Sequence, residues 1–171
     1  MPTMTGEPVA GLTAPPGDGP GFAQWVRPHL VAMSRLAARL AVGADRDDIV
    51  QEALARAWSK RSQYDAGRGT PSAWLLAITA DQARKAVRRT HRGLVLLPDD
   101  ESRRPDLDAR MDVEDAVQAL PARQRLAVDC YYFADLSIAE TAAVMGCSEG
   151  TVKSTLSDAR ARLRVVLEVS E

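Results

Sequence analysis

Apolar residues recur at intervals of three and four along most of the chain, and no stretch alternates apolar and polar positions as a half-buried strand does. Spacing of this kind is typical of amphipathic helices. The sequence therefore predicts an all-α protein. The segments that carry the helical pattern are 22–42, 44–64, 71–91, 111–120, 121–133, 137–145 and 148–164.

The most informative pair of predicted helices lies between Leu136 and Arg164. Ser137 and Glu140 have the spacing of a capping box, in which each side chain bonds the other residue's backbone N–H. Gly146 is placed to end this helix in the left-handed conformation, and Ser148 can cap the next helix directly afterwards. Two short helices joined by a tight turn with glycine are typical of a helix-turn-helix.

The second helix of this pair has one apolar stripe and one polar face. The apolar stripe consists of Val152, Leu156, Ala159 and Leu163. The opposite face carries small or basic side chains that can donate hydrogen bonds, namely Thr151, Lys153, Ser154, Thr155, Ser157 and Arg160. In a helix-turn-helix such a face enters the major groove of DNA. The alternative interpretation is an ordinary helical hairpin whose outer face is only solvated.

Composition divides the chain into four parts. Residues 1–21 contain five prolines and five glycines, which predicts a disordered N-terminal extension. Residues 22–92 form a first predicted helical domain. Residues 93–111 contain two prolines and five acidic residues, which indicates a flexible acidic linker. Residues 112–168 form a second small helical domain, which contains the helix-turn-helix.

The net charge of −1 conceals a separation of charge along the chain. Residues 22–92 hold 13 Lys or Arg against 6 Asp or Glu, whereas residues 112–171 hold 6 against 10. Positive charge is densest at the end of the helix predicted at 71–91, on Arg84, Lys85, Arg88, Arg89 and Arg92. Such a run complements the helix dipole. Beside a helix-turn-helix, neutralisation of nucleic-acid phosphates is the better interpretation.

The helix that follows Asp45 has a separate polar face. Asp45 is a good N-cap, and the acidic residues Asp47 and Asp48 lie favourably in the first turn. Val50, Leu54, Ala57 and Trp58 form its apolar stripe. Another face presents short polar side chains, Asp48, Gln51, Glu52 and Ala55. This face is either a solvated surface or a docking surface for a helix of a partner protein.

Several classes of protein are disfavoured. Cys130, Cys147, His29 and His91 lack metal-ligand spacing, so we expect no metal or cofactor and a reducing, cytoplasmic compartment. No apolar run approaches the ~20 residues of a membrane span, and the N-terminus lacks a secretory signal, so no stable membrane insertion is expected.

A carboxylate cluster of Asp47, Asp48 and Glu52 would suit an enzyme such as a recombinase. Helix capping explains these acids, and no nucleophile set or phosphate-binding loop accompanies them, so we expect no enzyme.

Four segments, in this order, resemble the extracytoplasmic-function sigma factors of bacterial RNA polymerase. They are DDIVQEALARAW (47–58), WLLAITADQARKAVRR (74–89), LPARQRLAVDCYYFADLSIAETAAVMG (120–146) and GTVKSTLSDARARLR (150–164). The resemblance covers roughly residues 22–168. It implies a two-domain subunit that binds core polymerase and directs transcription from promoters with −35 and −10 elements.

The resemblance also implies a role for each surface. Binding to the β′ clamp helices of core polymerase is implied for Asp47, Asp48, Gln51, Glu52 and Ala55. Binding of the melted −10 element is implied for Tyr64, Arg68, Trp74, Asp81, Arg84, Lys85, Arg88 and Arg89. Binding of the −35 element is implied for Ser148, Glu149, Thr151, Lys153, Ser154, Ser157 and Arg160. Further implied partners are the polymerase β subunit and an anti-sigma protein, and the acidic linker is similar to a tether that passes through the RNA exit channel.

Three positions depart from the family pattern. Asp81 stands where asparagine is common, and a carboxylate accepts from cytosine N4 but repels phosphate. Thr155 and Asp158 stand where arginine is frequent, which predicts weaker phosphate anchoring by this helix.

The alternative hypothesis is a stand-alone regulator that binds a palindrome as a dimer. That hypothesis gives no function to the polar face at 47–58 or to the acidic linker.

Overall fold

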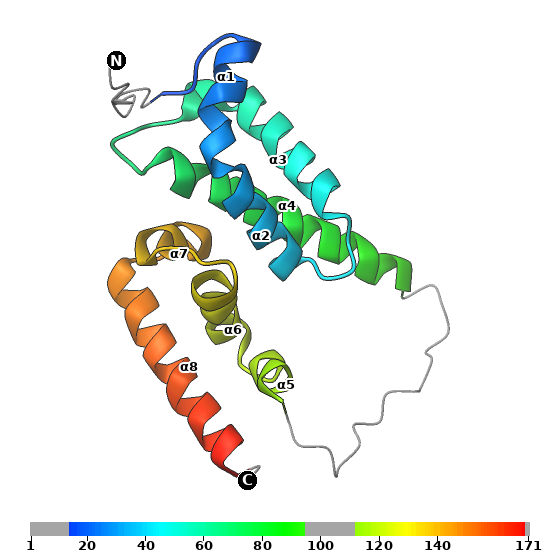
Figure 1. The fold of residues 1–171 in the computed structure, drawn as a ribbon, viewed down its shortest axis with the longest axis vertical. Coiled ribbons are helices and arrows are strands. Elements are labelled where there is room, and N and C mark those ends of the chain that lie inside the picture. The colour runs from blue at the N-terminus through cyan, green and yellow to red at the C-terminus, as the bar shows by residue number, and fades with distance from the viewer. Residues whose placement is uncertain (1–13, 95–111, 170–171) are drawn as a thin grey trace, which may run out of the picture.

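The structure is a computed structural model that describes residues 14–94 and 112–169 (Figure 1). Within these two ranges every regular element is helical, as the sequence predicted. The first range holds α1 (Gly19–Val26), η1 (Arg27–His29), α2 (Leu30–Leu40), α3 (Arg46–Ser59), η2 (Arg61–Gln63) and α4 (Pro71–Leu94). The second range holds α5 (Val113–Gln118), α6 (Ala122–Val128), η3 (Asp129–Phe133), α7 (Ile138–Met145) and α8 (Glu149–Val169). Most of the predicted extension and linker lies outside the described residues.

The first helix begins earlier than the apolar pattern predicted. Asp18 caps α1 by accepting a hydrogen bond from the Gly21 N–H at 2.8 Å, and a proline stands in the first turn. The helix therefore includes Gly19 to Gly21, so the expected boundary of a disordered extension at residue 21 is wrong. Pro28 lies in η1, which separates α1 from α2.

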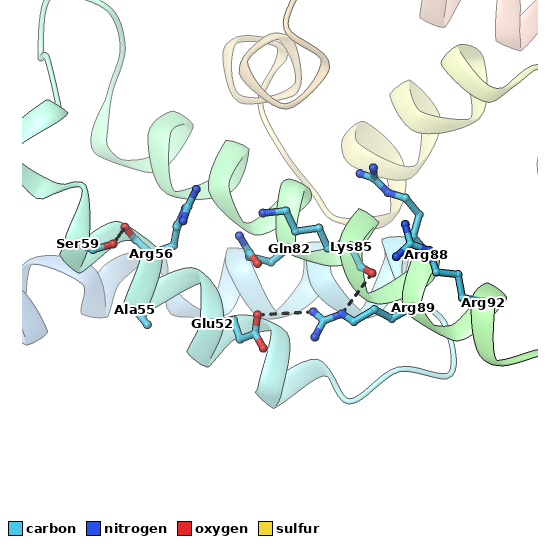
Figure 2. A pocket seen from close by; sticks show the side chains of 9 residues that line it. All are labelled: Glu52, Ala55, Arg56, Ser59, Gln82, Lys85, Arg88, Arg89 and Arg92. Carbon is cyan, nitrogen blue, oxygen red and sulfur yellow. Dashed lines mark hydrogen bonds and ion pairs between the residues drawn. The ribbon is translucent and has the colours of Figure 1, made fainter.

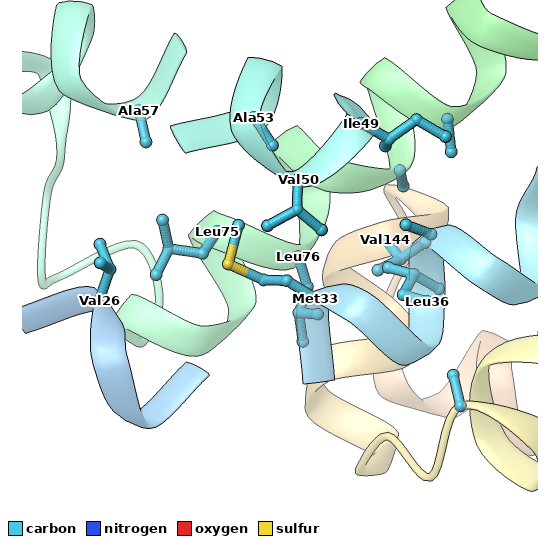
Figure 3. Close-up of a cluster of buried hydrophobic side chains, with 14 of the residues drawn as sticks. Val26, Met33, Leu36, Ile49, Val50, Ala53, Ala57, Leu75, Leu76 and Val144 are labelled. Atoms are coloured by element: carbon cyan, nitrogen blue, oxygen red, sulfur yellow. The ribbon is translucent and has the colours of Figure 1, made fainter. Parts of the chain in front are cut away.

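The helices α1 to α4 form an N-terminal module around a common core (Figure 3). Met33 and Leu36 of α2 and Leu75 and Leu76 of α4 are fully buried. The α3 helix contributes small buried residues, including Ala53, which allow it to approach α4 closely. The amphipathic spacing read from the sequence is the cause of this arrangement, because each helix turns one apolar stripe inward.

The C-terminal module contains the predicted helix-turn-helix. The capping box is present: the Ser137 N–H donates to Glu140 Oε2 at 2.8 Å, and the Glu140 N–H donates to Ser137 Oγ at 3.1 Å. Gly146 ends α7 in the left-handed conformation, with φ at 64°. Ser148 Oγ accepts from the Thr151 N–H at 3.2 Å and caps α8. A second core, around Val117, Leu120, Val152 and Leu156, holds α8 against α5 and α6.

Substituting alanine for Gly146 is expected to destabilise the chain by about 1–2 kcal/mol, because an L residue with a β-carbon strains this left-handed backbone. Chemical denaturation followed by circular dichroism measures the effect. Gly150→Ala is the matched control, because Gly150 lies in the first turn of α8 with ordinary backbone, and an added β-carbon would make only an ordinary contact, 3.9 Å from Ser148 Oγ. There alanine should be neutral or stabilising. Equal effects at both positions would contradict a conformational role for Gly146.

The cores of the two modules meet along α4 and α7. Four buried residues of the C-terminal module, Cys130, Ala134, Leu136 and Val144, belong to the same apolar cluster as α2 and α4. Figure 1 shows α7 lying across the face formed by α2 and α4, while α8 extends away from them. The sequence predicted two helical domains on a flexible linker. It did not predict that they pack against each other.

Candidate nucleic-acid interface

The polar face of α3 is exposed, as its helical spacing predicted. Asp45 Oδ1 accepts from the N–H groups of Asp47 and Asp48 at 2.9 and 3.2 Å, which fixes the start and rotation of the helix. The buried residues of the helix are Ile49, Val50, Ala53 and Ala57, whereas Leu54 and Trp58 of the predicted stripe are half-buried. All five residues of the predicted polar face are exposed, namely Asp47, Asp48, Gln51, Glu52 and Ala55. These residues form one surface available to a partner.

A basic groove runs between α3 and α4 beside this face (Figure 2). Its cationic side chains are Arg56 of α3 and Lys85, Arg88, Arg89 and Arg92 of α4. Glu52 also borders the groove and pairs with Arg89, with 3.6 Å between Oε2 and Nη2. Both side chains are more than half exposed, so this pair adds little stability. The groove brings the predicted polymerase-binding face next to cations predicted to bind DNA. Arg56 was not among the DNA-binding residues predicted from the sequence, because a single arginine on an exposed helix face has no feature that distinguishes it from a solvated side chain.

Arg84 points away from this groove and toward the C-terminal module. Its Nη1 donates to Asp81 Oδ1 at 2.9 Å, and its Nη2 donates to the backbone carbonyl of Val144 at 3.1 Å. Asp81 is therefore the ion-pair partner of a cation on its own helix. The residues predicted to bind the −10 element consequently fall on two sides of α4.

The aromatic residues predicted near the −10 element form a cluster at the start of α4. Tyr64 and Trp74 pack edge to face with centroids 5.3 Å apart, and both rings contact Trp25. The Tyr64 hydroxyl donates to the Gly69 carbonyl at 3.0 Å, and burial raises its pKa. These contacts hold the turn at 64–70 against the helix. Tyr64 and Trp74 stay half-buried, and Arg68 in the turn is exposed.

The outer face of α8 is open along its length. Lys153, Ser157 and Arg160 are exposed, as are Ser148, Glu149 and Ser154. Thr151 is half-buried, because its Oγ1 lies 2.9 Å from Ser148 Oγ in the cap. Nη1 of Arg160 donates to the Tyr132 hydroxyl at 3.3 Å. Apart from the half-buried Thr151, the predicted −35 residues are therefore exposed on the second helix of the helix-turn-helix and its N-terminal cap.

A polar cluster joins the two modules, and no local pattern of residues indicates it. Arg39 Nε donates to Asp129 Oδ1 at 2.7 Å, its Nη1 donates to Glu114 Oε2 at 3.1 Å, and its guanidinium lies 3.6 Å from the Phe133 ring centroid. We call these four residues the Arg39 cluster. Burial raises the pKa of Asp129 more than the Arg39 guanidinium lowers it. Recognising the cluster required knowing which helices meet, because Arg39 and Asp129 are 90 residues apart.

Another polar contact joins the modules at the start of α4. The Ser72 hydroxyl donates to Glu140 of the capping box. Burial alone would raise the pKa of Glu140, but the hydrogen bonds from Ser72 and Ser137 and the charge of nearby His29 outweigh it, so this pKa is lowered. Glu140 is therefore a carboxylate that caps its own helix and contacts the other module.

Within residues 14–94 and 112–169 no group of three His, Cys, Asp or Glu residues has the arrangement of a metal site. Burial raises the pKa of Cys130 to about 12, so its thiol stays protonated and packs as a small apolar group. Over the same part of the chain no helix is long and apolar enough to cross a bilayer.

The two modules coincide with two family models. Residues 25–93 match sigma-70 region 2, and residues 110–163 match sigma-70 region 4. The ECF RNA polymerase sigma factor SigM of Mycobacterium tuberculosis is 33% identical over 160 residues, which cover 88% of this chain and 79% of SigM. The RNA polymerase sigma-E factor of Streptomyces coelicolor is 33% identical over 150 residues, which cover 84% of each chain.

Two solved structures share the fold. One is CnrH in complex with the cytosolic domain of CnrY, with a TM-score of 0.64, 25% identity and coverage of 91% of this chain and 92% of CnrH. The other is the sigma factor RpoE in complex with the anti-sigma factor NepR from Bartonella quintana, with a TM-score of 0.61, 29% identity and coverage of 88% and 98%. The chain thus belongs to the ECF sigma factors and directs RNA polymerase to specific promoters.

Proposed function

We propose that the N-terminal module, residues 22–92, binds core polymerase and the −10 element, and that the C-terminal module, residues 112–168, binds the −35 element. The observation that carries this assignment is the exposure of both candidate faces on segments that match sigma-70 regions 2 and 4. The linker at 93–111 joins the modules and lets each bind its own target.

In this proposal the exposed α3 face binds the β′ clamp helices of core polymerase. An acidic and amide-bearing face with short side chains suits a helical partner that carries cations, because such a partner can approach the backbone closely. The contact residues are Asp47, Asp48, Gln51, Glu52 and Ala55. The polymerase β subunit is a further proposed contact of the chain.

The single-stranded −10 element is proposed to bind along α4 and the turn before it. Aromatic edges and cations are the groups that bind bases and backbone of single strands. The contact residues are Tyr64, Arg68, Trp74, Asp81, Arg84, Lys85, Arg88 and Arg89. Asp81 is the member of this set that would favour cytosine over the other bases.

The −35 duplex is proposed to accept α8 in its major groove. Backbone contacts come from the cap and from cations, and base contacts come from the outer face of the helix. The contact residues are Ser148, Glu149, Thr151, Lys153, Ser154, Ser157 and Arg160.

We further propose that the chain has no catalytic activity of its own, works in the cytoplasm with core polymerase and promoter DNA, and is held inactive by an anti-sigma protein. The support for that last partner is that the similar structures of CnrH and RpoE are complexes, with CnrY and with the anti-sigma factor NepR.

Run-off transcription with purified core polymerase tests the proposed function. The template is a pooled library in which the −35 and −10 segments are randomised, and the transcripts are sequenced. The chain should stimulate transcripts from templates that share one −35 and −10 pair, whereas core polymerase alone should not. Absence of any enriched pair, or enrichment of a palindrome bound by the chain without polymerase, would reject the proposal.

A further inference from the structure

We propose that Asp81 and Arg84 act together as the reader of one cytosine in the −10 strand, and that Arg84 is a specificity-determining residue. The inference rests on the proposed binding of this strand along α4, and it assigns one base to one pair of side chains. Arg84 Nη1 donates to Asp81 Oδ1 at 2.9 Å, so the two side chains form one polar unit in the structure.

Arg84 is set apart from the other cations of α4. Lys85, Arg88, Arg89 and Arg92 line the basic groove beside α3, whereas Arg84 does not (Figure 2). A row of cations suits phosphates, whose contacts position a strand but carry no sequence information. Arg84 instead holds a carboxylate one turn earlier on its own helix. An acceptor and a set of donors held side by side are suited to the edge of a base.

The pair is accessible to a base. The side chains of Arg84 and Asp81 are 38% and 67% exposed. An ion pair this exposed adds little stability, so the fold does not depend on it. Asp81 follows Trp74 by seven residues, which places both on one face of α4, about 10 Å apart along the helix axis. A strand with one base at the aromatic cluster can therefore present a nearby base to the pair.

The hydrogen-bonding groups of the pair complement the Watson–Crick edge of cytosine. Cytosine offers one donor, N4–H, followed by two acceptors, N3 and O2. The Asp81 carboxylate can accept from N4–H, and the Arg84 guanidinium can donate to N3 and O2. In the structure Nη2 of Arg84 donates to the Val144 carbonyl at 3.1 Å while Nη1 stays bonded to Asp81. The guanidinium can thus bind a carboxylate and a carbonyl together, and cytosine O2 would replace the Val144 carbonyl.

The other three bases match the pair less well. Thymine presents O4 in place of N4–H, which sets an acceptor against the Asp81 carboxylate. Adenine offers N6–H and N1 but lacks the second acceptor. Guanine can donate N1–H and N2–H to the two oxygens of a free carboxylate, but Arg84 already engages one of them. Arg84 therefore changes Asp81 from a carboxylate that accepts cytosine or guanine into one that selects cytosine.

Arg84 also offsets a charge that would hinder binding of the strand. Asp81, Lys85, Arg88 and Arg92 are exposed and recur at intervals of four, three and four, so they share one face of α4. An unpaired carboxylate in this row would repel the phosphates that the cations attract. The guanidinium of Arg84 balances the carboxylate, so Asp81 can contact a base without weakening the hold on the backbone.

Transcription by the holoenzyme from four templates tests this reader. The randomised library gives the −10 position at which cytosine is enriched, and the templates differ only there. With the unaltered chain, cytosine should exceed thymine by at least about fivefold, which is the discrimination that a good pair of hydrogen bonds provides. Asp81→Asn should reduce this ratio to below about twofold, because an amide can turn to donate to thymine O4. Arg84→Lys should keep most activity, because the charge remains, but should accept guanine as well as cytosine.

Arg88→Ala is the matched control, because it removes a cation that lines the basic groove of the same helix. It should lower transcription from all four templates by one factor and leave the order of bases unchanged. Circular dichroism should show unchanged helix content for every variant, since Asp81 and Arg88 are exposed and Arg84 is partly exposed.

Three results would overturn the proposal. They are an enriched −10 element without a cytosine, an unchanged order of bases for Asp81→Asn or Arg84→Lys, and the same loss of order for Arg88→Ala. Failure of the proposed function is separately visible, because the unaltered chain would then enrich no −35 and −10 pair at all, which would reject both.

Discussion

Asp48→Arg is expected to weaken binding of the chain to core polymerase by at least about 100-fold, because reversing a charge at a close ionic contact costs several kcal/mol. Asp48 lies in the exposed face of α3, and its side chain is not needed for the helix start. The cap is formed by Asp45, which accepts from the Asp48 backbone N–H at 3.2 Å. Titration of labelled protein with core polymerase, followed by fluorescence anisotropy, measures the affinity.

Glu168→Arg is the control for this variant. It makes the same change of charge at an exposed helical position near the end of α8, outside every proposed contact. Its affinity for core polymerase should equal that of the unaltered chain. If Asp48→Arg binds as tightly as Glu168→Arg, the α3 face is not the polymerase-binding surface, and the basic groove beside it becomes the better candidate.

Asp48 is a cleaner test position than Glu52. Glu52 pairs with Arg89 across the basic groove, so any change there also alters a cation that is proposed to bind DNA. The pair is exposed and contributes little to stability. It nevertheless connects the α3 face to the basic groove, which were predicted as two separate surfaces.

The local signals in the sequence predicted most of the helices. Capping residues act within one turn, so Asp45, Ser137 and Ser148 could be assigned without knowledge of the tertiary fold. Gly146 likewise marks the end of α7 through its own backbone conformation. Helical periodicity then fixed which face of α3 and of α8 is exposed.

The sequence could not show what each buried face packs against. Leu136 and Val144 were apolar positions of the C-terminal segment, yet they contribute to the core of the N-terminal module. Arg39 lies in an amphipathic helix like many exposed arginines, and its partners are distant in sequence. The five-residue turn η3 also departs from the predicted α-helix, since the Ala134 N–H donates to the Asp129 carbonyl at 2.8 Å. Such features depend on long-range packing, which periodicity does not report.

Opposite changes of charge on α8 are expected to move −35 recognition in opposite directions. Lys153→Glu should reduce transcription from a matched promoter by about 30-fold or more, because it replaces a phosphate-attracting cation with an anion at the exposed face. Asp158→Arg should strengthen promoter binding, because it removes a repulsive carboxylate and restores a cation that the family pattern favours. Run-off transcription over a series of salt concentrations measures both.

The salt dependence separates a DNA contact from a change in folding. Each phosphate contact contributes about one to the slope of log affinity against log salt, so Lys153→Glu should flatten the slope and Asp158→Arg should steepen it by about one. A variant that only destabilised α8 would lose activity without a matching change in slope. Both side chains are exposed and lie five residues, or about 1.4 turns, apart on the helix, so neither change disturbs the buried stripe of Val152, Leu156 and Ala159. Parallel slopes for the two variants would mean that this face of α8 does not lie against the DNA backbone.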